Sequence, residues 1–253
     1  MGYKLTGAYI GTQQVRPKIP PYLCFTAEAA SSTIKLSKSG SPADVYLETS
    51  TDWNTWSSYT IWSTITLSNV WDKVYRRSTS ETPVTLSSAN TNNYRFSMTW
   101  TIAASWDINY LLCKYSTDTL FDYCYTYLFQ SCTSLTSSPK LPATTLASDC
   151  YRYMFADCTN LKTINILPAT TLPRRCYANM YNSCSSIKLS PTALTNYTQA
   201  YRIPSEWTGT TGTNSLDSMF SGTGWGDWTS YSDIPSTPSI NTTYYVHKNN
   251  III

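Results

Sequence analysis

Glycine and charge are both scarce in this chain. Only 9 of its 253 residues are glycine, although globular proteins average about 7 % glycine. Charged residues make up 13 % of the sequence, and the net charge of +3 is spread without clusters. Because nucleic-acid binding needs a clustered basic surface, we expect no nucleic-acid partner.

Catalytic groups are scarce as well. The chain has a single histidine, His247, which removes most Ser-His-Asp and Cys-His arrangements. It contains no G-x-S-x-G, H-E-x-x-H or G-x-x-x-x-G-K-[ST] motif. We therefore predict that the protein is not an enzyme and holds no cofactor. Two carboxylates suffice for glycoside hydrolysis and need no local motif, so a carbohydrate-active enzyme stays an alternative.

Long apolar runs are missing too. No segment approaches the length of about 20 residues that a transmembrane helix needs. The opening residues, M-G-Y-K-L-T-G-A-Y-I-G-T, lack the apolar stretch of a signal peptide. The sequence thus predicts neither a membrane partner nor export through a signal of its own.

Serine and threonine are abundant instead, at 73 of the 253 residues. With so little charge, this balance favours strands and ordered loops over helices. Short segments with alternating apolar side chains recur between residues 22 and 108, and we expect them to form a small β-sandwich. The predicted strands cover 22–27, 33–37, 45–49, 58–61, 64–67, 73–77 and 94–99.

Tryptophan occupies the turns between those segments, where a tight turn favours glycine because a bulky side chain resists positive φ. One interpretation is that the indoles pack against the sandwich or form an exposed aromatic surface. The other is that a reassigned UGA codon, read as glycine in the host, has been translated as tryptophan. The tryptophans concerned are Trp53, Trp62, Trp71, Trp100 and Trp106.

A 26-residue unit occurs three times in the middle of the chain. Its copies begin T-L-F-D-Y-C-Y-T-Y-L-F at 119, T-L-A-S-D-C-Y-R-Y-M-F at 145 and T-L-P-R-R-C-Y-A-N-M-Y at 171. A fixed period in this range predicts a solenoid, in which each copy buries its apolar face against its neighbours. We expect such a surface to bind rather than to catalyse.

Five apolar residues of each copy are spaced as one face of a short helix. In the second copy they are Cys150, Tyr151, Met154, Phe155 and Cys158. A short strand and a proline-closed turn complete the predicted unit. The pattern decays after residue 187, although L-D-S-M-F at 216–220 echoes the Met-Phe pair. The strand-like tail at 239–253 would cap the last apolar face, as solenoids require.

Six cysteines recur with the repeat and would stack in two columns. The two cysteines of one copy are eight residues apart, or about 12 Å along a helix, whereas a disulfide needs Cα atoms within about 7 Å. Disulfides between copies stay open as an alternative to buried free thiols. The C-x7-C spacing does not fit a zinc site, so we predict no metal. The columns are Cys124, Cys150 and Cys176, and Cys132, Cys158 and Cys184.

Aromatic and arginine side chains off the apolar face are the candidates for ligand binding, because such side chains are favoured in binding surfaces. The alternative is that the tyrosines cover neighbouring coils and the arginines are ordinary solvated charges. The candidates are Tyr127, Arg152, Tyr153, Arg174 and Arg175.

The repeat, C-Y-x-x-M-F-x-x-C-T-x-L followed by L-P-A-T-T-L, resembles the BspA-type leucine-rich repeats of surface proteins, in the form common in tail-fibre and adhesin-like proteins of gut bacteriophages. Y-L-C-F-T-A at 22–27, S-T-I-K-L-S-K-S-G-S-P at 32–42 and I-A-A-S at 102–105 are similar to the β-domain that often precedes those repeats. The chain departs from that pattern at the tryptophans, where glycines would be expected, and in having only about three good copies.

The resemblance implies a non-enzymatic virion protein, tail- or head-fibre-like, that is made in the host cytoplasm and carried on the particle. It would attach to other virion proteins through its N-terminal region and present the repeats to a host-surface glycan or protein. Homotrimers are common among such fibres, although no residue pattern in this chain encodes one. A bacterial surface adhesin of the BspA-like type is the main alternative.

The expected fold class is α+β. It comprises an N-terminal β-sandwich, a short leucine-rich-repeat solenoid of about three 26-residue coils, and a β-rich C-terminal cap. The expected domains are an arm at 1–21, the sandwich at 22–108, the solenoid at 109–200 and the cap at 201–253.

Overall fold

The computed structural model describes residues 9–10, 13–14, 22–225 and 235–253. Its architecture is mostly β, with several open sheets. Within those ranges the only helix is the four-residue 3-10 helix η1 (Ile108–Leu111), so the α part of the expected α+β class is wrong. No helix in the same ranges is long and apolar enough to cross a membrane. Most of the expected arm at 1–21 lies outside the described residues.

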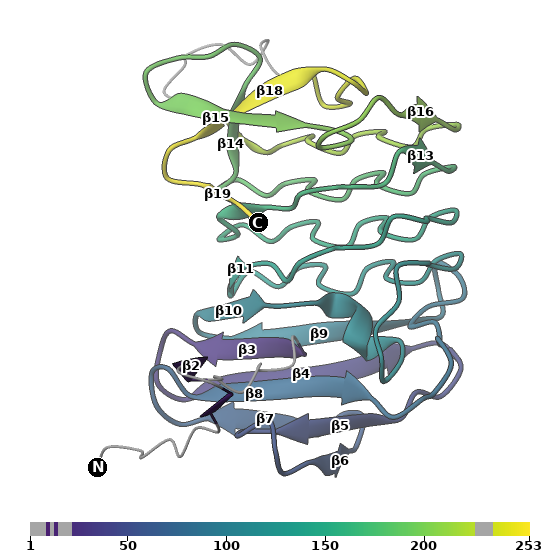
Figure 1. Cartoon of the computed structure of the whole chain (residues 1–253), viewed down its shortest axis with the longest axis vertical. Coiled ribbons are helices and arrows are strands. Elements are labelled where there is room, and N and C mark those ends of the chain that lie inside the picture. The colour runs from purple at the N-terminus through teal and green to yellow at the C-terminus, as the bar shows by residue number, and fades with distance from the viewer. Residues whose placement is uncertain (1–8, 11–12, 15–21, 226–234) are drawn as a thin grey trace.

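The strands are short and follow one another throughout the chain (Figure 1). In order they are β1 (Tyr9–Ile10), β2 (Gln13–Gln14), β3 (Leu23–Ala27), β4 (Ser32–Ser39), β5 (Leu47–Ser50), β6 (Ser57–Tyr59), β7 (Thr64–Leu67), β8 (Lys73–Ser78), β9 (Asn93–Thr99), β10 (Ile102–Ser105), β11 (Leu135–Ser137), β12 (Thr163–Ile164), β13 (Thr171–Leu172), β14 (Lys188–Ser190), β15 (Tyr197–Arg202), β16 (Thr210–Thr211), β17 (Gly224–Trp225), β18 (Thr243–His247) and β19 (Ile251–Ile252).

Strands β3 to β11 build two sheets at one end of the molecule (Figure 1). The larger sheet has the order β11-β10-β3-β8-β5-β6 and the smaller has the order β7-β4-β9. Phe25 of the larger sheet packs edge-on against Phe96 of the smaller, with ring centroids 5.1 Å apart. The seven strands expected between 22 and 99 are confirmed, with ends shifted by at most two residues.

The helix expected over each repeat is wrong, because each repeat contains a ten-residue run of turns instead. We call these runs the turn segments 1 to 4; they cover 122–131, 148–157, 174–183 and 213–222. Within segment 1, the Cys124 and Thr126 N–H groups donate to the carbonyl three residues earlier. The N–H groups of Tyr123 and Tyr125 donate to segment 2 instead. Five such bonds of 2.7–3.1 Å join each pair of neighbouring segments.

A left-handed residue at every fourth position produces these turns. Positive φ, between 51° and 66°, occurs at the second, sixth and tenth residues of every segment. The apolar side chains therefore repeat with a period of four, which keeps Cys150 and Cys158 on the same side. A helix of 3.6 residues per turn would rotate two residues of that spacing about 80° apart. The left-handed residues are Tyr123, Tyr127, Ser131, Asp149, Tyr153, Asp157, Arg175, Asn179, Ser183, Asn214, Ser218 and Gly222.

Segment 4 extends the stack beyond the three copies that the sequence makes obvious. It begins 39 residues after segment 3, because the intervening chain forms β14, β15 and β16. Leu216, Met219 and Phe220 are buried in it, at the places that the echo in the sequence indicated. The strand-like tail is confirmed in β18 and β19. Strand β18 pairs with β15, and β19 returns to pair in parallel with β12 of the second repeat.

Aromatic rings stack in columns through the layers. The longest column begins at Phe96 in β9 and continues with neighbouring centroids 4.9–6.0 Å apart. Because this column starts in the smaller sheet and ends in segment 4, the two sheets provide the layer on which the repeats stack. One cluster of buried side chains accordingly runs from Leu23 to Val246. The later members of the column are Phe129, Phe155, Tyr181 and Phe220.

Candidate functional site

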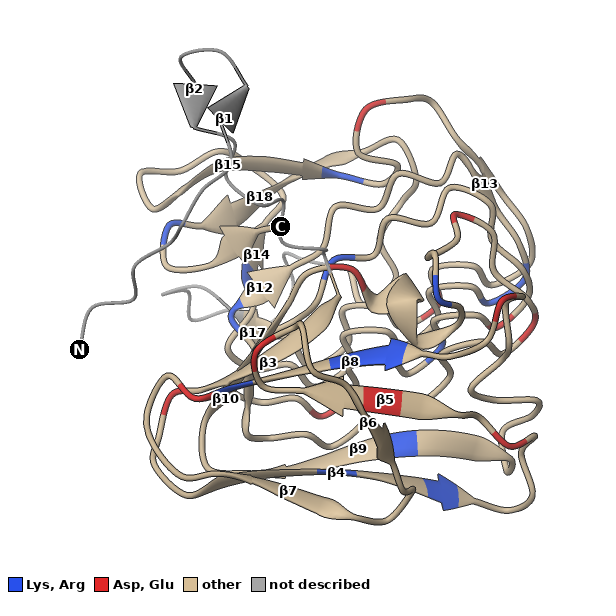
Figure 2. Cartoon of the chain, turned by 60° about the horizontal axis from the view of Figure 1, so that its bottom comes forward, with Lys and Arg blue, Asp and Glu red and all other residues tan. Residues whose placement is uncertain are grey.

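Charge does not mark a site in this protein. Lys and Arg are interspersed with Asp and Glu over the sheets and the repeats (Figure 2). In the part of the chain that the structure describes, no group of three or more His, Cys, Asp or Glu side chains could hold a metal ion. The residues predicted to bind a ligand lie instead on the repeats.

Tyr127 and Tyr153, two of the predicted binding residues, lie side by side. Their rings stack at 5.2 Å with an interplanar angle of 16°. The Arg95 guanidinium lies 4.7 Å from the Tyr127 ring centre, and the Arg152 guanidinium lies 5.0 Å from that of Tyr153. Both tyrosines are half-buried, and burial raises the pKa of Tyr127. The faces of both rings are covered by each other and by the two arginines. The pair therefore stabilises the packing between repeats and leaves little aromatic surface open to a ligand.

Arg152 and Arg174 share the buried carboxylate of Asp149. The distances are 3.4 Å from Arg152 and 3.0 Å from Arg174, and the Asp149 side chain is only 1 % exposed. Arg152 also donates to the Asn90 side chain at 2.9 Å. Arg175 is half-buried and left-handed, and its backbone N–H joins segments 3 and 4. The structure thus brings four of the five predicted residues into one strip, held together by contacts within the protein.

The six repeated cysteines are buried free thiols. In one column each thiol donates to a backbone carbonyl of the preceding layer. These bonds run from Cys132 to Phe96 at 3.2 Å, from Cys158 to Phe129 at 3.0 Å and from Cys184 to Phe155 at 3.0 Å. Burial raises the pKa of the Cys132 thiol to about 12. The thiols therefore stay protonated at neutral pH and act as small core side chains.

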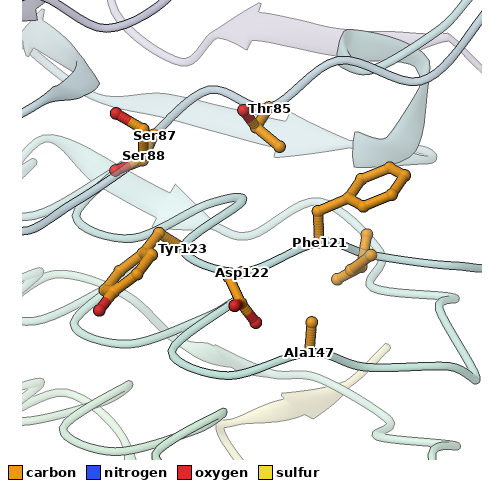
Figure 3. A pocket seen from close by; sticks show the side chains of 8 residues that line it. Thr85, Ser87, Ser88, Phe121, Asp122, Tyr123 and Ala147 are labelled. Carbon is orange, nitrogen blue, oxygen red and sulfur yellow. The ribbon is translucent and has the colours of Figure 1, made fainter.

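A shallow pocket of about 550 Å³ lies where the 84–92 loop meets the first repeat. Figure 3 shows its layers: Thr85, Ser87 and Ser88 on one strand of chain, Phe121 to Tyr123 on the next, and Ala147 beyond them. The Phe121 side chain is 45 % exposed although it is strongly apolar. The pocket therefore combines aromatic rings, hydroxyls and a carboxylate on one open surface.

Asp122 is held in place within this pocket by the next layer. One of its carboxylate oxygens accepts the backbone N–H of Ser148 at 2.8 Å. Among the lining side chains it is the one charged group. Such a combination of aromatic faces with hydroxyl and carboxylate acceptors suits a ligand that is rich in hydroxyl groups.

Sequence reasoning missed this pocket, although the repeat contained a signal for it. At equivalent places the first copy has F-D-Y, the second A-S-D and the third P-R-R. The buried positions that follow hardly change between copies, because stacking requires them. These three positions vary in exposure as well as in residue type, since Phe121 and Asp122 are exposed whereas Asp149 is buried. Only the first copy places two aromatic side chains there, and this difference between copies is the signal in the sequence.

Comparisons with protein-family models, with curated proteins and with solved structures found no match to this chain. What the fold defines is therefore a class: a mostly β protein in which stacked turn segments extend a pair of open sheets.

Proposed function

We propose that this chain is a non-enzymatic structural protein of a bacteriophage particle, tail- or head-fibre-like. It attaches through its N-terminal region and presents its repeats to a host-surface glycan or protein. In this proposal the two sheets are a β-sandwich, and the turn segments form a leucine-rich-repeat solenoid of the BspA-like type. The virion context rests on the resemblance of the repeat sequence; the binding role rests on the pocket at the first repeat.

The pocket supports a saccharide as the ligand. Phe121 supplies an exposed apolar face for the C–H side of a sugar ring, while Ser88 and Asp122 supply hydrogen-bonding groups beside it. Because its only charged lining group is a carboxylate, the pocket favours a neutral or amino sugar over a sialylated or sulfated one. Retaining and inverting glycosidases use two carboxylates flanking the bond, so a single carboxylate supports binding rather than hydrolysis.

A glycan array probed with the purified full-length chain tests the binding role. We expect neutral or amino-sugar glycans to be bound and left uncleaved. Phe121→Ala should reduce that signal at least tenfold, because the apolar face is lost. Ile166→Ala is the matched control, since Ile166 is 46 % exposed and lies outside the pocket. Equal loss in both variants, or binding that survives Phe121→Ala, would contradict this site.

The virion role is tested separately. Peptides of this chain should appear in a digest of purified phage particles, and their absence would defeat the proposal. A bacterial surface adhesin is the alternative function, because the same pocket would bind a glycan equally well on a phage particle or on a bacterial surface. Capsid and portal genes beside the coding sequence would favour the phage protein, whereas surface or secretion genes would favour the adhesin.

A further inference from the structure

The five tryptophans that stand in turns all have left-handed backbones. Their φ angles lie between 57° and 77°, which makes each a conformational outlier for so bulky a side chain. The prediction that these turns require positive φ is thereby confirmed. The values are 57° for Trp53, 77° for Trp62, 73° for Trp71, 58° for Trp100 and 68° for Trp106.

The indole rings offer little that would offset this strain. Trp71 is 71 % exposed and Trp100 is 65 % exposed. Trp62 is 56 % exposed, and Lys35 lies 6.0 Å from its ring centre. Trp53 keeps one edge contact, with Tyr75 at 6.0 Å. At these positions the side chains therefore do not determine the backbone.

The backbone groups of these residues, in contrast, are used by the fold. The Trp71 N–H donates to Ala27 at 2.8 Å, and the Trp62 N–H donates to Leu36 at 2.9 Å. The Trp106 carbonyl accepts from Lys140 at 2.8 Å. At these positions the fold requires a left-handed backbone, whereas the side chain contributes few contacts. Glycine is the residue that usually occupies such positions.

Two other tryptophans show the opposite behaviour. Neither Trp56 nor Trp207 is among the residues with positive φ. Trp56 packs against Tyr22 at 5.0 Å and lies 4.0 Å from the Arg77 guanidinium, so its indole is part of the structure. Large left-handed residues do occur in the turn segments, but there Tyr127 and Tyr153 stack on each other. Apart from the edge contact of Trp53 with Tyr75, no ring contact of this kind is found at the five turn tryptophans in the described part of the chain.

We propose that the natural protein carries glycine at these five positions. Its host would read UGA, a stop codon in the standard code, as glycine, and the printed sequence gives that codon as tryptophan. Five additional glycines would also relieve the scarcity of that residue. The exposed indoles over the two sheets are then no binding surface, and the protein is made in a cell whose translation uses this altered code.

The coding sequence and the natural protein test this directly. We expect UGA at the five positions and UGG at Trp56. Peptides from the protein isolated from its natural particle or cell should have glycine masses at the five sites and a tryptophan mass at Trp56. UGG codons at the five positions, or tryptophan in the natural peptides, would overturn the proposal.

A stability measurement tests the strain independently of the gene. Trp100 and Trp207 are almost equally exposed, at 65 % and 66 %, but only Trp100 has positive φ. In the recombinant chain, Trp100→Gly should raise the melting temperature by about 2–4 °C, the shift expected when one left-handed residue is relieved. Trp207→Gly should leave it unchanged or lower it. A fall with Trp100→Gly, or equal shifts in the two variants, would contradict the structural basis of the proposal.

Discussion

The rings of Tyr125 and Tyr151 stack with centroids 5.6 Å apart, yet only one of the two hydroxyls is satisfied. The Tyr125 hydroxyl donates to Asn109 Oδ1 at 2.9 Å, and the Ile108 carbonyl oxygen lies 3.2 Å away as a second acceptor. The buried Tyr151 hydroxyl has no hydrogen-bond partner. Tyr125 and Tyr151 occupy equivalent places in two repeats, but their hydroxyls contribute differently to stability. The residues of η1 supply hydrogen-bond partners to the first repeat and not to the second.

Removing each hydroxyl should separate these roles. Tyr125→Phe leaves a buried amide oxygen without its partner, so we expect a loss of about 1–3 kcal/mol in the free energy of unfolding. Tyr151→Phe removes a hydroxyl that is already unsatisfied and should be neutral or stabilising. Urea unfolding of the two variants and the parent chain measures the difference. A larger loss for Tyr151→Phe than for Tyr125→Phe would show that the second hydroxyl has a partner.

The Asp149 carboxylate should matter more for stability than either arginine beside it. It is buried and accepts from both Arg152 and Arg174, whereas the Arg174 side chain is 46 % exposed. We expect Asp149→Ala to lower the free energy of unfolding by about 1–3 kcal/mol and Arg174→Ala by about 0–1 kcal/mol.

A further variant at Asp149 separates the lost ion pair from the backbone. Asp149 has a φ of 57°, so Asp149→Gly should be less damaging than Asp149→Ala by about 1 kcal/mol. Denaturant melts of both variants provide the comparison. Equal losses would mean that left-handed strain at this place is negligible.

The strands could be predicted from the sequence, but the conformation of the repeats could not. The difference lies in how specific each spacing of apolar residues is. In β4 and β9 the apolar side chains alternate, and alternation is specific to strands. In the repeat, the spacing i, i+1, i+4, i+5 fits a helix over one turn and a four-residue period over several. The eight-residue separation of Cys150 and Cys158 distinguishes the two conformations. Only a period of four places both side chains on the buried side of the repeat.

None of the five residues predicted to bind a ligand lines the pocket. The spacing of Tyr127 and Tyr153 predicts that they lie off the apolar face; in the structure both are half-buried and their rings stack on each other. That their ring faces would be covered depends on Arg95, which comes from β9 and is distant in sequence. The pocket likewise needs Thr85 and Ser88 from the 84–92 loop, whose approach to Phe121 no local pattern encodes.

The thiol columns should make the protein sensitive to alkaline pH. Burial raises the pKa of Cys124 and of Cys132 from 9.0 to about 12. Between those values the unfolded chain loses thiol protons that the folded chain retains. The free energy of unfolding should therefore be unaffected by these groups below about pH 9 and should fall as the pH rises towards 12. Each thiol contributes a slope of up to about 1.4 kcal/mol per pH unit.

Cys132→Ala isolates one thiol from the lysines and tyrosines that titrate in the same range. Urea unfolding of the parent and the variant at several values between pH 8 and pH 11 gives the dependence of the free energy of unfolding on pH for each chain. The two slopes should differ by at most about 1.4 kcal/mol per pH unit. We expect the variant to be less stable than the parent at pH 8, because a buried side chain and its bond to Phe96 are lost. The gap should narrow as the pH rises, since only the parent has this thiol to deprotonate on unfolding. A gap that stays constant to pH 11 would mean that the Cys132 thiol titrates alike in the folded and unfolded chain, and that the column is open to water.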